Sequence, residues 1–270
     1  MKNDMNVSMV LSSCDSYDDT WRPFFAQLRK HWSDFNMPVY LGTESKTFQY
    51  DQFDIRCPLS EGEKCSQWSK RILRLLDHVE TDYVLFALDD FWLIDDVDQA
   101  AFYKILNYMK QTKRMGFVCL KQEVIPGKSS ENDIASCIDS EYPELYRCLK
   151  NKTFRITTQF GLWRKSYLKK ILRDHESAWY FETRASWRSK FYWERVYSVK
   201  QSVFKYPVGG FIWGGKCYED YIELFDRDLI SHTIAKRGII KYGSPRKYPD
   251  VEKNFNYYYS KILSALPKWR

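Results

Sequence analysis

The chain has 270 residues, of which 44% are hydrophobic and 17% aromatic, and it carries a net charge of +7. This composition excludes disorder over most of the length and permits one large domain with a substantial core. No apolar run approaches the roughly 20 residues that span a bilayer, and the first apolar run, 7–11, is too short for a signal peptide. We therefore expect a cytoplasmic protein.

Short apolar runs alternate with helical patterns through the first 120 residues. The apolar runs predict strands at 6–12, 37–42, 53–57, 83–88 and 116–120. Apolar residues at helical spacing predict helices that begin near Asp18, Trp68 and Asp98. This order indicates an α/β fold with a mostly parallel, Rossmann-type sheet flanked by helices. Ligands of such sheets bind at the carboxyl ends of the strands.

The second half of the chain is less regular. Residues 123–152 are polar and interrupted by prolines and a glycine, so we expect a mobile excursion there. We expect order to resume at 153–162, with a short helix following at 166–172. Further along, Gly209-Gly210 and Gly214-Gly215 bracket an apolar triplet, as in a hairpin or a flexible lip.

The positive charge is concentrated at the C-terminal end. Residues 236–270 alone carry the whole net charge of the chain. Apolar residues from Phe255 to Leu266 recur at helical spacing with lysines beside them, which predicts a helical, basic C-terminal extension. Such a helix can lie on an anionic membrane or pack its aromatic face onto the body of the protein.

The sharpest feature is the Asp89-Asp90 pair that ends the apolar run 83–88. Two carboxylates at the end of a buried strand are costly unless a cation or hydrogen-bond donors satisfy them. Mg²⁺ and Mn²⁺ bind carboxylate oxygens and fill the rest of their shell with water and substrate phosphates. The alternative is a surface turn or helix cap.

Together, these motifs resemble the bacterial GT-A glycosyltransferases of surface-polysaccharide (capsule or O-antigen) synthesis. The resemblance rests on four features: the strand-to-helix start at 7–15, the aspartate pair, Gln-x-Gly-Leu-Trp-Arg from Gln159, and Glu-x-x-Trp-x-x-Glu from Glu176. It implies transfer of a sugar from a nucleotide diphosphate sugar, UDP-linked, to a saccharide or lipid-linked saccharide acceptor. It also implies a nucleotide-sugar-binding half (1–122), an acceptor-binding half (123–235) and the extension 236–270.

The resemblance further implies roles for individual residues. Asp90 is the first choice as ligand of Mn²⁺ or Mg²⁺, and Asp89 either shares the metal or faces the donor ribose. The same comparison places donor contacts at Cys14, Asp15, Tyr17 and Arg71. An Asx-turn at Asp15 and a solvated Arg71 are the ordinary alternatives.

An inverting transfer needs a base that deprotonates the acceptor hydroxyl. The resemblance favours Glu182, although a surface salt bridge explains that residue nearly as well. Glu176 is the alternate, and it would also suit a helix cap. His232 is the one histidine placed to serve as an extra metal ligand of the kind some GT-A enzymes use. Peripheral membrane contact through the C-terminal helix would suit a lipid-linked acceptor.

Two other classes of protein compete with a transferase. A glycoside hydrolase also uses two carboxylates, but it does not need them at a nucleotide-type sheet. A nucleic-acid-binding protein would explain the basic tail, but a binding groove usually gathers charge from several elements. No P-loop or G-x-G-x-x-G motif supports a kinase or dehydrogenase.

Overall fold

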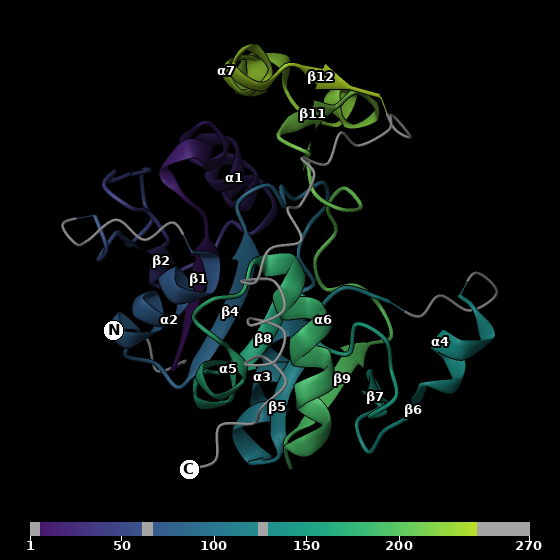
Figure 1. The fold of residues 1–270 in the computed structure, drawn as a ribbon. Helices are drawn as coiled ribbons and strands as arrows, with labels where there is room; N and C mark the ends of the chain where they lie inside the picture. Colours follow the sequence, from purple (N-terminus) through teal and green to yellow (C-terminus); the bar gives the residue numbers. More distant parts are fainter. Residues whose placement is uncertain (1–5, 61–66, 124–128, 242–270) are drawn as a thin grey trace, which may run out of the picture.

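The computed structural model describes residues 6–60, 67–123 and 129–241. These residues form a nine-stranded sheet with helices on both faces, and a small three-stranded sheet beyond one end of it (Figure 1). No helix among them is long and apolar enough to cross a membrane.

The main sheet is mostly parallel. Its strand order is β3-β2-β1-β4-β8-β5-β9-β7-β6, and β7 and β8 run opposite to the other seven described strands. The strands are β1 Val7–Ser12, β2 Val39–Leu41, β3 Ile55–Arg56, β4 Tyr83–Leu88, β5 Met115–Cys119, β6 Cys137–Asp139, β7 Leu145–Cys148, β8 Gly161–Arg164 and β9 Arg195–Val199. The predicted α/β class and the largely parallel sheet are confirmed.

The helices follow the strands in the expected alternation through β5. They are α1 Asp18–His31, α2 Trp68–His78, α3 Gln99–Gln111, α4 Glu131–Ala135, α5 Lys165–Ile171, α6 Ala178–Arg188 and α7 Arg227–Arg237, with 3₁₀ turns η1 Asp15–Tyr17, η2 Ser189–Phe191 and η3 Glu219–Leu224. The Asp98 side chain caps α3 by accepting a hydrogen bond from the backbone N–H of Ala101, as an N-cap aspartate should.

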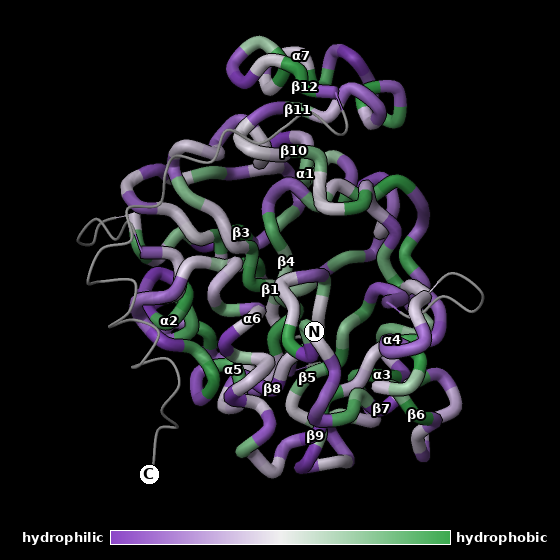
Figure 2. Tube along the Cα trace, turned by 45° about the vertical axis from the view of Figure 1, so that its right-hand side comes forward, coloured by the Kyte–Doolittle hydropathy of each residue, from purple (hydrophilic) through white to green (hydrophobic). Residues whose placement is uncertain are grey.

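The core has two layers because successive strand residues point to opposite faces. In β4, Leu85 packs in the layer that includes α1 and α3, whereas Phe86 packs in the layer that includes α2, α5 and α6. Figure 2 shows the apolar trace along β1 and β4 where these strands cross the middle of the molecule. A strand covered on both faces reads as the unbroken apolar run seen at 83–88.

The expectation of a mobile excursion at 123–152 is wrong for the described part of that segment. Strands β6 and β7 form a hairpin, and β7 pairs with β9 from Leu145↔Val199 to Cys148↔Val196. The segment thus extends the main sheet by two strands. Its polar sequence suits an edge position, where only some side chains are buried.

The small sheet consists of β10 Ile212–Trp213, β11 Lys216–Tyr218 and β12 Ile239–Ile240. The predicted hairpin is confirmed, since β10 and β11 pair antiparallel through Gly214-Gly215, both with positive φ. Helix α7 packs on α1, and Thr233 Oγ1 donates to the carbonyl of Asp19 at 2.8 Å. The predicted basic helix lies outside the described residues.

Candidate active site

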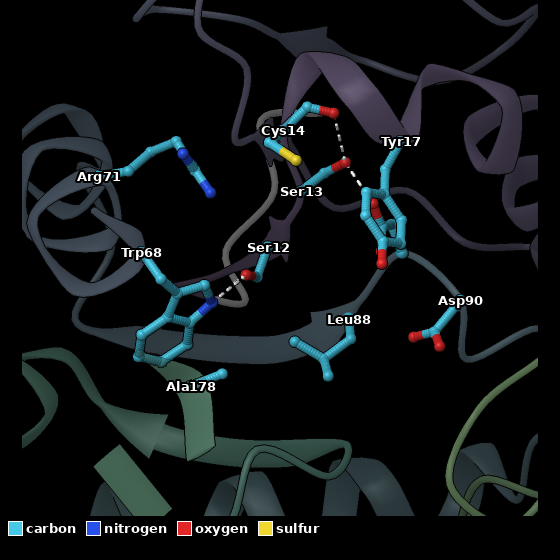
Figure 3. Close-up of a pocket in the computed structure, with 10 residues that line it drawn as sticks. Ser12, Ser13, Cys14, Tyr17, Trp68, Arg71, Leu88, Asp90 and Ala178 are labelled. Carbon is cyan, nitrogen blue, oxygen red and sulfur yellow. Dashed lines mark hydrogen bonds between the residues drawn. The ribbon is translucent and has the colours of Figure 1, made fainter. Parts of the chain in front are cut away.

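A pocket of about 230 Å³ lies where β1 and β4 end, at the carboxyl edge of the main sheet (Figure 3). Its lining comes from the end of β1 and the turn after it, from α2, from the end of β4 and from the first residue of α6: Ser12, Ser13, Cys14, Tyr17, Trp68, Arg71, Leu88, Asp89, Asp90 and Ala178. The structure thus brings together five residues predicted for the donor and metal site: Cys14, Tyr17, Arg71, Asp89 and Asp90.

Asp89 is held in place by a chain of hydrogen bonds from β1 and α1. The Ser13 hydroxyl donates to Asp89 Oδ2, and Trp21 Nε1 donates to the same Ser13 oxygen at 2.7 Å. Trp92 Nε1 binds the Asp89 carbonyl at 3.0 Å. The side chain is only 5% exposed, so its orientation is fixed before any ligand binds.

Asp90 lies beneath the loop that leads into β10. The backbone N–H of Phe211 donates to the Asp90 carbonyl at 2.9 Å, and that of Ile212 approaches Asp90 Oδ2 at 3.4 Å. At Gly210, which has a φ of +88°, a Cβ atom would collide with the Asp90 carboxylate. Glycine is therefore required there both by backbone conformation and by the closeness of Asp90.

Burial and mutual repulsion disfavour the charged forms of the two carboxylates. Burial, and then the charge of Asp90, raises the pKa of Asp89 well above its usual value. Burial likewise raises the pKa of Asp90. Neither carboxylate has an ion-pair partner among the described residues, and the charge of Arg237 offsets the effect only in part.

A hard divalent cation fits this donor set. Buried carboxylate oxygens with no ion pair are the ligands that Mg²⁺ and Mn²⁺ prefer. Within the described ranges, no three His, Cys, Asp or Glu side chains gather as a metal-binding group. His232 accordingly does not join Asp89 and Asp90, and its side chain is exposed on α7. A metal would take its remaining ligands from water and from the diphosphate of a substrate.

Two cations that the sequence did not point to lie beside Tyr17, although they do not line the pocket. Arg237 lies over the Tyr17 ring at 4.0 Å and donates to Asp19 through Nε at 2.6 Å. Lys236 also pairs with Asp19, at 2.8 Å. Burial and the charge of Asp89 raise the pKa of Tyr17. Both cations belong to the basic segment that the sequence alone assigned to the tail.

Asp15 does not line the pocket. Its carboxylate accepts hydrogen bonds from the backbone N–H groups of Glu44 and Ser45 at 2.8 and 3.0 Å, and from the Ser45 hydroxyl. Glu44 in turn pairs with Arg71 Nη1 at 2.8 Å. Asp15 thus fixes the loop that positions Arg71, which matches the turn alternative more closely than direct donor contact.

Trp68 is a lining residue that the sequence placed in a core stripe. Its indole Nε1 donates to Ser12 Oγ at 2.8 Å, and its ring packs 5.5 Å from that of Phe181. The indole lies across the pocket from Tyr17 (Figure 3). The two rings offer apolar surface on two sides of the same pocket.

Glu176 lies outside the pocket in a buried ion pair. Its two carboxylate oxygens accept from Arg188 Nη1 and Nη2, both at 2.7 Å, and the pair is almost completely buried. The backbone N–H of Glu176 donates to Ser69 Oγ at 2.8 Å. Both oxygens are therefore already engaged in holding α6 to the rest of the fold.

Glu182 lies one helical turn beyond Ala178 on α6 and is half-buried. Its Oε1 accepts from the Thr158 N–H at 2.6 Å and from the hydroxyls of Thr157 and Thr158. No described residue binds Oε2, which leaves that oxygen for a ligand. Glu182 does not line the pocket of Asp89 but stands beside it along the helix.

Glu123 is a further carboxylate that the sequence did not single out. It follows β5 at the same edge of the sheet and pairs with Lys152 Nζ at 2.9 Å. Burial raises its pKa, the charge of Lys152 lowers it, and the charge of Glu182 raises it again. Glu123 and Glu182 are therefore close enough for the charge of one to affect the pKa of the other.

No protein-family model matches the chain, and no curated protein sequence matches it. Solved structures do match: S. aureus TarS 1–349 aligns with a TM-score of 0.50 and 14% identity over 87% of this chain and 66% of that one. TarS 1–349 in complex with UDP-GlcNAc gives 0.46 and 12%, over 87% and 68%. The galactosyltransferase LgtC in complex with donor and acceptor sugar analogs gives 0.38 and 9%, over 97% of each chain. The chain has a GT-A-like glycosyltransferase fold, and it spans about two thirds of the TarS fragment.

Proposed function

We propose that this protein is a metal-dependent glycosyltransferase that moves a sugar from a nucleotide diphosphate sugar to a saccharide acceptor. The observation that carries the proposal is the Asp89-Asp90 pair, buried in a pocket at the carboxyl edge of the sheet with no ion-pair partner among the residues that the structure describes. A nucleotide sugar that brings a divalent cation supplies both the missing positive charge and the occupant of the pocket.

Asp90 and Asp89 would hold Mn²⁺ or Mg²⁺. When bound, such a cation neutralises charge on the departing diphosphate. The chain supplies the rest of the donor site: Tyr17 and Trp68 offer ring faces to the nucleoside, and Arg71 offers its guanidinium to the base or diphosphate. The TarS fragment, which shares the fold, has been solved with UDP-GlcNAc, so a UDP-sugar is the first donor to test.

The acceptor site would lie along α6. Trp179 follows the pocket residue Ala178, is 58% exposed and meets the Phe154 ring at 6.2 Å. Exposed aromatic faces of this kind pack well against sugar rings. Glu182 Oε2 would accept the proton of the acceptor hydroxyl while Thr157 and Thr158 hold Oε1, and attack on the face opposite the diphosphate would invert the sugar.

Isothermal calorimetry of nucleotide-sugar turnover, with and without Mn²⁺, tests the proposal. We expect heat from UDP-sugar turnover that requires Mn²⁺ and disappears in EDTA. The Asp34→Asn variant, altered at an exposed surface carboxylate, should match the wild type. Full turnover in EDTA would reject metal dependence, and cleavage of free saccharides without a nucleotide would favour a glycoside hydrolase.

A further inference from the structure

A second pocket, of about 300 Å³, lies at the opposite edge of the main sheet. Its walls come from residues around the starts of β5 and β9 and from residues that end and follow β7, in the lower part of Figure 1. Because β7 runs against β9, its carboxyl end meets the amino ends of β9 and β5. The five residues of β5, roughly 16 Å of strand, separate this edge from that of Asp89.

The second pocket is strongly basic. Five cationic side chains line it, against the single carboxylate of Glu194: Arg114, Arg147, Lys150, Arg155 and Arg195. Glu194 is already paired with Lys170 at 3.0 Å, and Arg195 with Glu141 at 2.9 Å. The other four cations have no ion-pair partner in the part of the chain that the structure describes. The pocket therefore carries a net positive charge, which favours an anionic ligand.

Arg155 is the clearest of these cations because it is only 4% exposed. Its Nε donates to the Cys148 carbonyl at 3.3 Å and its Nη1 to Ser189 Oγ at 2.6 Å, so the guanidinium is held in a fixed orientation. Both acceptors are neutral. A buried charge without a counter-charge is costly, and an anionic ligand in this pocket would offset that cost.

Trp193 adds an aromatic wall beside the cations. Its side chain is 53% exposed, and the Arg114 guanidinium lies 5.9 Å from the ring centroid. Guanidinium groups bind phosphate oxygens in a bidentate manner, and an indole face covers the apolar side of an attached organic group. Arginines and an aromatic face together fit a phosphate ester better than a bare anion.

We propose that this second pocket binds the phosphate group of a phosphate ester, with the organic part lying on Trp193. The ester is either a soluble phosphorylated carbohydrate or the headgroup of an anionic lipid, because both present the same phosphate chemistry. The proposal does not depend on the reaction at Asp89 and Asp90, since the two pockets lie at opposite edges of the sheet.

The first arm of the test titrates the full-length protein with glucose 6-phosphate and with glucose by isothermal calorimetry at low salt. We expect saturable binding of glucose 6-phosphate and no binding of glucose. The double variant Arg114→Gln with Arg147→Gln should weaken it by about tenfold or more, because it removes two cations that bind phosphate. Trp193→Ala should weaken glucose 6-phosphate binding more than inorganic phosphate binding.

The matched control is Lys30→Gln with Lys110→Gln, which removes the same charge from exposed helix positions elsewhere. The melting temperature of each variant shows that the fold is retained. The second arm sediments the protein with phosphatidylglycerol or phosphatidylcholine vesicles. Binding to the anionic vesicles that is lost in the Arg114 and Arg147 variant, but not in the control, would identify a lipid headgroup as the source.

Two results would overturn the proposal. One is the absence of binding to both glucose 6-phosphate and anionic vesicles at low salt. The other is binding that falls equally in the double variant and in the lysine control, because the ligand would then respond to net charge and not to this pocket.

Discussion

Two buried carboxylate sites in this protein differ in how their charge is balanced. Glu176 makes two hydrogen bonds of 2.7 Å with Arg188, and neither side chain is more than 1% exposed. Asp89 and Asp90 are nearly as buried, yet they adjoin each other and have no ion-pair partner among the described residues. One site is complete within the protein, whereas the other leaves charge to be balanced from outside.

The difference separates a carboxylate whose counter-charge lies within the fold from a pair that the proposed function assigns to ligand binding. A satisfied ion pair contributes to the fold and offers no free oxygen, as at Glu176. An unsatisfied pair costs stability, which the fold tolerates where a cation or substrate restores the balance. The two sites are similar in burial. They differ in whether a buried cation pairs with the carboxylate.

The largest loss of stability should follow from breaking the Glu176–Arg188 ion pair. Glu176→Gln leaves the Arg188 guanidinium buried without its counter-charge, so the free energy of unfolding should fall by about 3–5 kcal/mol. Urea denaturation measures this, with the exposed Glu80→Gln as control. A loss below about 1 kcal/mol would contradict the structural role of the pair.

At Asp90, by contrast, a substitution should lower turnover and leave the stability of the fold nearly unchanged. Asp90→Asn should lower turnover by roughly 10²–10³-fold, because stabilisation of the departing diphosphate is lost. The fold should be retained, since the asparagine oxygen can still accept from the Ile212 N–H. Turnover and a urea midpoint are measured on the same preparation. A variant that unfolds would place Asp90 in the same class as Glu176.

Glu182 lies between these extremes, because Oε1 is engaged and Oε2 is not. Glu182→Gln should lower kcat by about a hundredfold, the lower end of what general-base catalysis contributes, and leave donor affinity unchanged. An equal loss of donor affinity would make Glu182 a donor-site residue, and a larger kcat loss in Glu123→Gln would move the base to Glu123.

The smallest effect concerns stability and pH in the absence of metal. The folded pKa of Asp90 is raised above its unfolded value, so the folded protein binds more protons and this site loses stability as pH rises through the two pKa values. Asp90→Asn removes that loss. The variant should therefore be more stable than the wild type at pH 8 and almost equal to it at pH 4. A gain that shrinks as pH rises would contradict the charge assignment.

The sequence predicted the first half of the fold well because its signals are local. The run 83–88 is β4 to the residue, and the predicted helix after Asp98 is α3. The pocket-lining residues at the ends of β1 and β4 could be foreseen, because parallel strands end at one edge. Local patterns did not show that β8 would insert between β4 and β5, or that 123–152 would add β6 and β7.

The parts of the site that the sequence did not predict depend on contacts between residues far apart in the chain. The Ser13 hydroxyl reaches Asp89 across 76 positions of sequence, and Arg237 reaches Asp19 across 218. Nothing near Glu176 in the sequence indicates that Arg188 neutralises it, although a spacing of twelve residues into the following helix permits such a pair. Pairings of this kind decide which carboxylates already have a counter-charge, and only the fold reveals them.

Binding of UDP with and without Mn²⁺ tests most directly whether Asp89 and Asp90 hold a metal for a nucleotide diphosphate. Isothermal calorimetry should show UDP binding that tightens by about tenfold or more with Mn²⁺ in the wild type and in Asp34→Asn, but not in Asp90→Asn. Equal UDP affinity with and without Mn²⁺ in the wild type, or a Mn²⁺ effect that survives in Asp90→Asn, would contradict it.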